Sequence, residues 1–244
     1  MAISVDTIYQ RVLALANKEQ RGYITPQEFN LLANQAQISI FESYFYTKNQ
    51  RERVEVDRSN EIDETDISEL IDMKLGPFQS FEAVTSGHTF PATVTVDSVA
   101  YDVFQTGIVF LGDEPCQKVS VFDAQRLKKS QRHMATTANE APIYTNNRVS
   151  GRDIVVYAGS TDEETSSVTV ECFRVPKTAN WTYVVVNSKA LFNSTLAVDF
   201  ELHKSETDTL VNKILMLAGI VLNKVGLANT ASAVITNEAQ SQNT

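Results

Sequence analysis

The chain has 244 residues and a mass of 27.1 kDa, and 43% of its residues are hydrophobic and 21% charged. A chain of this size and composition can bury a substantial apolar core, so the disordered and fibrous classes are excluded. With 21 basic and 30 acidic residues the net charge is −9, which argues against a protein that grips nucleic-acid phosphates over its whole surface. The two cysteines, Cys116 and Cys172, lie too far apart for a zinc motif and suggest no disulfide framework.

The start of the chain, from Met1 to Asp6, lacks the basic and apolar regions of a secretory signal. The most apolar stretch, residues 210–227, contains two Asn–Lys pairs, and such a segment would cross a bilayer only at high cost. We therefore expect a soluble chain in a reducing compartment, with no membrane partner.

Two helices are predicted at the N-terminus. Apolar residues recur at helical spacing between Val5 and Ala16, which predicts the first helix and places Leu15 on its apolar face. Thr25-Pro26-Gln27-Glu28 then combines an N-cap, a proline at the first helical position and the glutamate of a capping box. The second helix is expected to end near Thr47. Its predicted buried residues are Phe29, Leu32, Ala33, Ala36, Ile40, Phe41, Tyr44 and Phe45.

A strongly acidic segment, residues 50–72, follows, and its few apolar residues permit a short helix that Gly76-Pro77 ends. The pattern then changes to alternation, which predicts a hairpin around Asp97-Ser98 with a turn that lacks glycine. Asp123 is predicted to cap a short helix. The predicted strands lie at 93–96, 99–103, 107–111, 143–145, 152–158, 167–174 and 183–187, and the strand at 152–158 is apolar enough to be covered on both faces.

The C-terminal part returns to helix. Ser205-Glu206-Thr207-Asp208 is a second capping signature, and the apolar residues from Leu210 to Val225 predict a helix buried on most sides. Residues 229–244 are mostly Ala, Ser, Thr, Asn and Gln, a composition that cannot repay its own ordering entropy. We expect this tail to be disordered until a partner binds it.

These elements predict an α+β fold. The N-terminal helical hairpin and the C-terminal helix are expected to form one helical layer, with a mostly antiparallel β region inserted between them. The expected domains are the helical hairpin with the acidic segment (1–75), the β-rich insertion (76–190), the C-terminal helical segment (191–228) and the tail (229–244).

Nothing in the sequence forms a recognisable catalytic motif. Cys172 alternates with Val168 and Val170, so its thiol is expected to be a small buried hydrophobe. The three imidazoles are those of His88, His133 and His203. The sequence therefore predicts no enzyme, no catalytic residue, no metal and no cofactor. A hydrolase that works through one of the histidines and a carboxylate pair, such as Asp199 and Glu201 beside His203, stays an alternative.

Two charged clusters remain. The basic cluster has no interleaved aromatic residues, so it is expected to contact an acidic neighbouring protein rather than stacked bases. Its members are Arg126, Lys128, Lys129 and Arg132, followed by His133. The carboxylates between Asp57 and Asp72 have no apolar pocket to separate their pKa values, and a solvated acidic face is the simpler interpretation.

Residues Asn17 to Glu28 align with a twelve-residue calcium loop, including the glycine at position six and the glutamate at position twelve. Arg21 occupies position five, where an oxygen ligand belongs, and Lys18 adds a second positive charge. A glycine turn followed by a capping box is the simpler interpretation, and an EF-hand-like calcium-sensing module is the alternative.

The segment Asn17-Lys18-Glu19-Gln20-Arg21-Gly22-Tyr23-Ile24-Thr25-Pro26-Gln27-Glu28-Phe29-Asn30 resembles the opening of virion structural proteins of crAss-like and related marine podovirus-like tailed phages. Further similar segments follow in the same order: 141–144, 174–177 with Trp181, 199–203, 210–219 and a Gln-rich end. The resemblance covers both ends and part of the middle, and residues 76–140 match least.

The resemblance implies a ring or adaptor protein of the head-to-tail connector, which binds below the portal in a ring of about twelve copies. It implies a virion protein made in the host bacterial cytoplasm, with the portal, neighbouring copies and the next tail or ring protein as partners. Genomic DNA would pass without sequence-specific binding, since an acidic wall repels phosphate. Another tail or capsid accessory protein is the alternative within the same class.

Two sets of site residues follow from this interpretation. The expected channel-facing acids are Asp57, Glu61, Asp63, Glu64 and Asp66. The expected partner-docking residues are Arg126, Lys128, Lys129, Arg132, Leu227, Ala228, Gln240 and Gln242.

Overall fold

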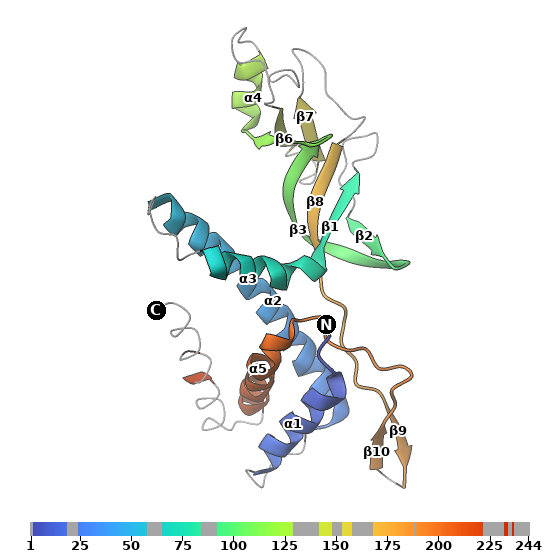
Figure 1. Cartoon of the computed structure of the whole chain (residues 1–244). Coiled ribbons are helices and arrows are strands. Elements are labelled where there is room, and N and C mark those ends of the chain that lie inside the picture. Colours follow the sequence, from blue (N-terminus) through green and yellow to red (C-terminus); the bar gives the residue numbers. More distant parts are fainter. Residues whose placement is uncertain are drawn as a thin grey trace. The chain divides into compact units, whose positions relative to one another are not determined.

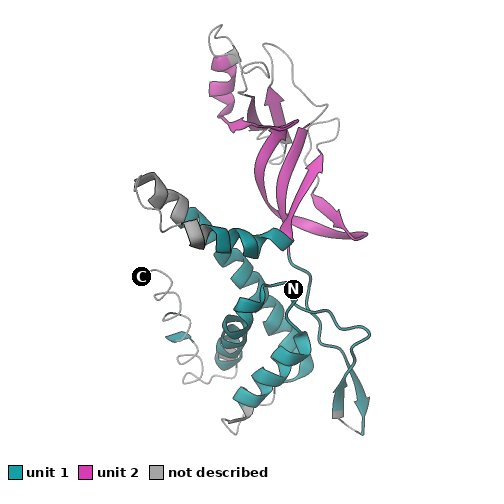
Figure 2. Ribbon diagram, in the orientation of Figure 1, with its two compact units in different colours: residues 1–77, 176–244 teal, residues 78–175 magenta. Residues whose placement is uncertain are grey.

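The predicted α+β class is confirmed by the computed structural model, in which the helices α1, α2 and α5 pack together and antiparallel sheets lie between them in the chain (Figure 1). The structure describes residues 2–18, 24–57, 65–83, 92–128, 142–147, 153–157, 168–187, 189–221, 232–233 and 236. The chain divides into two compact units, Met1–Pro77 with Pro176–Thr244 and the inserted Phe78–Val175 (Figure 2).

The first unit is built on helices α1 (Val5–Lys18), α2 (Pro26–Asp57) and α5 (Thr207–Val221). Every residue predicted on the apolar face of α2 is buried, and α5 contacts both α1 and α2. The helix α1 buries Val5, Ile8, Val12 and Ala16, whose spacing keeps them on one face, but Leu15 is 40% exposed, contrary to the prediction.

The helix α2 continues to Asp57, so the predicted end near Thr47 is wrong. No glycine or proline lies between Thr47 and Asp57, and a polar sequence by itself does not stop a helix. The third helix, α3 (Thr65–Leu75), contacts α2, and Lys48 pairs with Asp72 across the two helices at 3.0 Å. As predicted, α3 ends at Gly76-Pro77, in a short 3-10 helix (Gly76–Phe78).

The predicted capping box at the start of α2 is confirmed. The Thr25 N–H donates to Glu28 Oε2 at 2.9 Å, and the Glu28 N–H donates in return to Thr25 Oγ1 at 3.3 Å. These bonds satisfy two amides that the first turn leaves without partners. The bond from the Thr25 N–H and a second one from the Thr25 hydroxyl, at 2.8 Å to Glu28 Oε2, hold the pKa of the Glu28 carboxyl below its ordinary value of 4.5.

The substitution Glu28→Ala is expected to lower the free energy of unfolding at neutral pH and to have a smaller effect in acid. Because the pKa of Glu28 is lower in the folded than in the unfolded chain, its stabilisation is present above pH 4.5 and is lost as the pH falls through the folded value. Urea unfolding of both proteins at pH 7 and near pH 3 measures this, with Glu69→Ala as an exposed control. A difference that is the same at both pH values contradicts the prediction.

The inserted unit contains two sheets. The larger runs in the order β1-β8-β3-β2, with β4 also paired to β3, and all its pairs are antiparallel. In the smaller sheet β5 pairs β6 in parallel and β6 pairs β7 in antiparallel orientation. The strands are β1 (Gln79–Ala83), β2 (Thr93–Val96), β3 (Val99–Leu111), β4 (Glu114–Pro115), β5 (Gln117–Lys118), β6 (Ile143–Asn147), β7 (Asp153–Tyr157) and β8 (Val168–Arg174).

The predicted hairpin around Asp97-Ser98 is confirmed as β2 and β3, and both turn residues have positive φ, 52° and 67°. The separate strand predicted at 107–111 is wrong, because these residues are the second half of β3. The register of β3 against β8 shifts at two places, which lets one continuous strand bend. At the second shift the Ile108 N–H donates to the side chain of Glu171, at 2.9 Å to Oε2.

Both sheets contribute to the core of the inserted unit. Its buried residues are Val94, Val109, Leu111, Cys116, Tyr144, Ile154, Val156, Val168, Val170 and Cys172. Ile154, Val155 and Val156 are all buried, which confirms that this strand is covered on both faces. Cys172 is fully buried, as predicted, and burial raises the pKa of its thiol. Burial also raises the pKa of the Cys116 thiol, to about 11. Both thiols are therefore protonated and unreactive at neutral pH.

The helix α4 (Val121–Lys128) is present where a short helix was predicted, but its cap is Ser120 and not Asp123. The Asp123 N–H donates to Ser120 Oγ at 3.1 Å, and the Ser120 hydroxyl donates to the Asp123 carboxylate at 2.6 Å. Asp123 thus lies at the third helical position, where its carboxylate binds the capping hydroxyl and its charge suits the helix dipole. No helix in the described part of the chain is long and apolar enough to cross a membrane.

Candidate protein-binding surface

Amide side chains of α2 hold an extended segment, residues 177–181, that leads into strand β9. Asn34 uses both ends of its amide: Nδ2 donates to the Ala179 carbonyl at 2.9 Å, and Oδ1 accepts from the Ala179 N–H at 2.8 Å. Asn30 binds Trp181 in the same way, at 3.1 Å to the carbonyl and 2.8 Å from the N–H. On this edge of the segment the two asparagines therefore take the place of a neighbouring strand, while Asn180 forms an antiparallel bridge with Val198.

The rise per residue of a helix and of an extended chain explains why Asn30 and Asn34 can pair with Trp181 and Ala179. Residues four apart on a helix are separated by about 6 Å, and residues two apart on an extended chain by about 6.6 Å, so successive amides meet alternate residues. Gln37 continues the row and donates to the Lys177 carbonyl at 2.6 Å. None of these three residues was predicted from the sequence to have a role. The available signal was that one face of α2 carries amides at positions 30, 34 and 37, where charged residues would be usual.

Trp181 anchors the strands that follow. Its side chain is 2% exposed, its Nε1–H donates to the Asp6 carboxylate at 2.9 Å, and its ring lies 4.2 Å from that of Tyr9 on α1. On its other side it stacks on Tyr183 and Phe192, each at 5.8 Å between ring centroids. One indole thus connects α1 to the next two strands.

These strands, β9 (Tyr183–Val186) and β10 (Lys189–Phe192), form a two-stranded hairpin that we call the arm, residues 183–192 (Figure 1). Strand β9 confirms the strand predicted at 183–187, whereas β10 was not predicted. Asn187, with φ 50°, begins the tight turn between them. Among the described residues the arm pairs with no third strand, so both of its edges are open.

The arm exposes apolar side chains on both faces. Opposite residues in an antiparallel pair share a face, so Val184 lies beside Leu191 on the face away from Trp181, and Val186 follows on the same face. These three side chains are 51%, 53% and 46% exposed, and Val185 on the other face is 63% exposed. An isolated hairpin is marginally stable in water, and a contiguous apolar surface of this kind marks a site for a protein partner.

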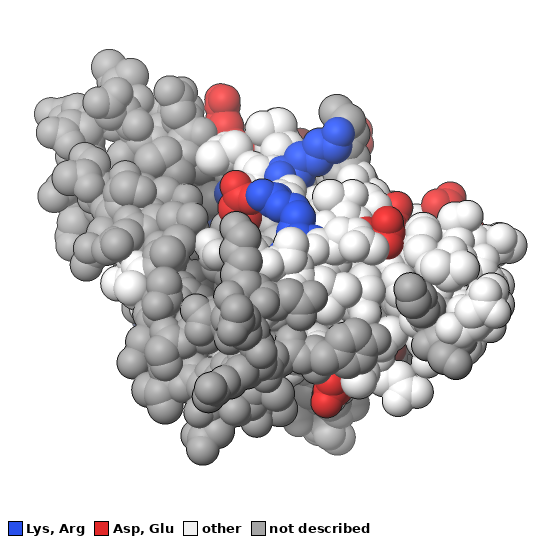
Figure 3. Space-filling view, turned by 90° about the horizontal axis from the view of Figure 1, so that it is seen from below, with Lys and Arg blue, Asp and Glu red and all other residues white. Residues whose placement is uncertain are grey.

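The arm and its approach contain no carboxylate. From Cys172 to Val198 the charged residues are three cations, Arg174, Lys177 and Lys189, in a chain whose net charge is −9. Seen from below, most of the described surface is formed by uncharged side chains (Figure 3). Of these three, Arg174 is buried in β8 and Lys177 Nζ lies 3.6 Å from Glu201 Oε1, so the arm itself contributes a single charged residue, Lys189.

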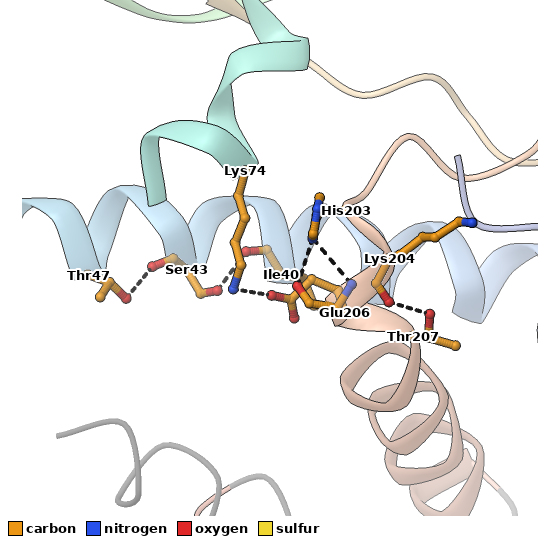
Figure 4. A network of polar contacts seen from close by, with 9 residues as sticks. Ile40, Ser43, Thr47, Lys74, His203, Lys204, Glu206 and Thr207 are labelled. Carbon is orange, nitrogen blue, oxygen red and sulfur yellow. Dashed lines mark hydrogen bonds and ion pairs between the residues drawn. The ribbon is translucent and has the colours of Figure 1, made fainter. Parts of the chain in front are cut away.

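A second polar cluster lies inside the first unit, where α2, α3 and the start of α5 meet (Figure 4). Lys74 Nζ and Glu206 Oε1 are 2.6 Å apart, and their side chains are only 12% and 10% exposed. Burial and the Glu206 carboxylate raise the pKa of Tyr44, and burial lowers the pKa of Lys213 against the opposing effect of Glu42 and Glu206. The groups neutralise one another within the packed helices, so we interpret the cluster as structural.

His203 caps the 3-10 helix Lys204–Glu206, so the predicted capping signature at Ser205 is wrong in detail. The His203 side chain accepts from the Ser205 N–H at 3.3 Å, and the nearby carboxylates are engaged elsewhere: Asp199 accepts from the Val5 N–H and Glu201 from the Lys177 N–H. His203 thus makes a local polar contact with Ser205, and His88 and His133 lie outside the described residues.

The predicted site residues fall mostly outside the described part of the chain. Arg126 is exposed on α4, and Lys128 is the last residue of that helix. Asp57 ends α2, and Asp66 lies in the first turn of α3. The remaining residues of both sets, Glu61, Asp63, Glu64, Lys129, Arg132, Leu227, Ala228, Gln240 and Gln242, lie outside the described residues. Both sets stay predictions.

Within the described ranges no group of three or more His, Cys, Asp or Glu side chains is placed to hold a metal ion. The calcium alternative is untested, because residues 19–23 of its loop lie outside those ranges, although Glu28 serves the capping box. No protein-family model matches the chain, and no curated protein matches its sequence.

Proposed function

We propose that this protein is a structural component of a tailed-phage virion, a ring or adaptor protein of the head-to-tail connector that binds below the portal. The observation that carries the proposal is the arm. Aromatic rings and amide pairs hold the base of the arm, and the arm exposes apolar side chains and unpaired strand edges. Exposed apolar surface and open strand edges are typical of proteins that bind other proteins. The resemblance of the chain ends to phage virion proteins supplies the class of assembly.

The charge of the chain supports the position along the DNA path. A net charge of −9 gives a ring of such chains a wall that repels phosphate, so DNA can pass without being held. In this proposal the acidic segment from Asp57 to Asp66 faces the channel, while the basic group beginning at Arg126 and the C-terminal tail contact the portal or a neighbouring protein.

Native mass spectrometry of the protein co-expressed with the portal protein from the same genome tests the proposal. About twelve copies bound to each portal ring are expected, because two closed rings that stack on each other form equivalent contacts when they have the same rotational symmetry. Detection of the protein in purified particles without any binding to the portal would move it to the tail or capsid. Absence from purified particles would contradict the virion function itself.

A further inference from the structure

The inserted unit begins and ends at neighbouring strands. Strand β1 follows Phe78, the first residue of this unit, and β8 ends one residue before Val175, the last. The two strands pair in antiparallel orientation, in a register that places Gln79 opposite Phe173. The chain therefore enters and leaves the unit at the same end of one strand pair, which is typical of an inserted unit that folds as a module.

A proline lies at each point where the chain passes between the two units. Pro77 comes directly before Phe78, and Pro176 comes directly after Val175. A proline has no backbone N–H, so neither residue can donate to a strand partner. In this part of the described chain only the three-residue 3-10 helix Gly76–Phe78 spans a boundary, and no α-helix or strand runs from one unit into the other.

A buried arginine connects three strands where the inserted unit begins and ends. The guanidinium carbon of Arg174, the last residue of β8, lies 4.5 Å from the ring centroid of Tyr101 on β3 and 5.6 Å from that of Phe78. These three residues, which we call the clamp, are 6%, 8% and 0% exposed. Beside them the Val175 N–H donates to the Asp102 carbonyl on β3 at 2.9 Å. A guanidinium can be buried here because it is planar, weakly hydrated and stacks on aromatic rings.

We infer that the inserted unit is a separate cooperative unit, closed by the clamp, which opens and closes again while the helices of the first unit stay folded. Every residue of its buried core and every residue of the clamp lies within Phe78–Val175. A part of a chain that has its own core and two short connections can unfold without the rest. The clamp ties the first residue of the unit to its last strand, so it holds the two ends of the unit together. This inference does not depend on the proposed function.

Hydrogen exchange of the full-length protein, measured by mass spectrometry at rising urea concentrations below the unfolding transition, tests the inference. The amides of β1, β3 and β8 are expected to share one free energy of opening and one urea dependence. The amides of α1, α2 and α5 are expected to share a different pair of values, because they are exposed in a different opening event.

The variant Arg174→Ala removes the guanidinium from between the two rings. Exchange in β1, β3 and β8 is expected to be faster by about tenfold or more, because buried packing and two cation–π contacts are lost, and exchange in α1, α2 and α5 is expected to be unchanged. The milder variant Arg174→Lys keeps the charge but not the planar group, and its exchange is expected to lie between the two. The matched control is Arg11→Ala, at an exposed arginine of α1 that pairs with Asp208, and it is expected to leave β1, β3 and β8 unchanged.

A single free energy of opening and a single urea dependence for both sets of amides in the wild type overturn the inference, because the chain then unfolds as one unit. Faster exchange that extends equally to α1, α2 and α5 in the Arg174 variants overturns it as well. If exchange in β1, β3 and β8 is the same in both Arg174 variants as in the wild type, the clamp does not close the unit and the inference is wrong. The protein is measured alone, so none of these results bears on its binding to the portal.

Discussion

Replacing Trp181 by alanine is expected to lower the free energy of unfolding by about 3 to 5 kcal/mol, the usual cost of removing a buried aromatic side chain. The indole is 2% exposed, and its removal separates Tyr9 of α1 from Tyr183 and Phe192 of the arm and leaves Asp6 without its donor. Urea unfolding followed by circular dichroism measures the stability, and hydrogen exchange measures the protection of the β9 and β10 amides, which is expected to be lost.

The variant Trp181→Phe is the matched control. It keeps an aromatic ring between Tyr9 and the arm but removes the hydrogen bond to Asp6, so a smaller loss of about 1 to 2 kcal/mol is expected. The arm amides should remain protected in this variant. If Trp181→Ala leaves their protection unchanged, the amide pairs on α2 hold the arm without help from the indole.

Replacing Glu206 by alanine is expected to cost about 3 to 5 kcal/mol, because it leaves Lys74 buried without its partner, next to the partly buried Lys213. Lys74→Ala is expected to cost less, since Lys213 remains close to the Glu206 carboxylate and partly balances it. Chemical unfolding at neutral pH of the two single variants measures this asymmetry.

The double variant K74A/E206A completes a thermodynamic cycle. Because it removes both charges together, its loss of stability is expected to be smaller than the sum of the two single losses. A strictly additive result, or a larger loss for Lys74→Ala than for Glu206→Ala, would contradict the assigned pairing. Neither residue belongs to the arm, so these variants test the packing of the helices alone.

The elements that could be predicted from the sequence are those whose signals are local. The Thr25–Glu28 capping box and the apolar face of α2 from Phe29 to Phe45 were predicted because caps and helical periodicity depend on residues within a few positions. The Asp97-Ser98 turn was predicted for the same reason. The wrong predictions also have physical causes. Strand β3 was predicted as two strands because its register shifts interrupt the alternation of apolar and polar residues on which a strand prediction depends.

The candidate site was poorly predicted, because its parts are distant in the chain. Asn34 and Ala179 are separated by 145 positions and Trp181 and Asp6 by 175, and no local pattern marks either pair. Strand β10 was missed because Ala190 and Leu191 show no alternation between apolar and polar residues. The same lack of alternation is informative once the pairing is known, since it means that both faces of the hairpin are apolar.

The sequence by itself determined the class of fold, the caps and the apolar faces, since these follow from composition and short-range spacing. It also determined the sign of the charge and the lack of carboxylates in the arm. Only the tertiary structure decided which apolar residues stay exposed: Val170 on β8 is fully buried, whereas Val184 on β9 is half exposed, although both lie in short apolar strands. The reason is that burial depends on which surfaces the rest of the chain brings against a strand: the sheets of the inserted unit cover Val170, whereas the face of the arm with Val184 lies away from Trp181 at its base.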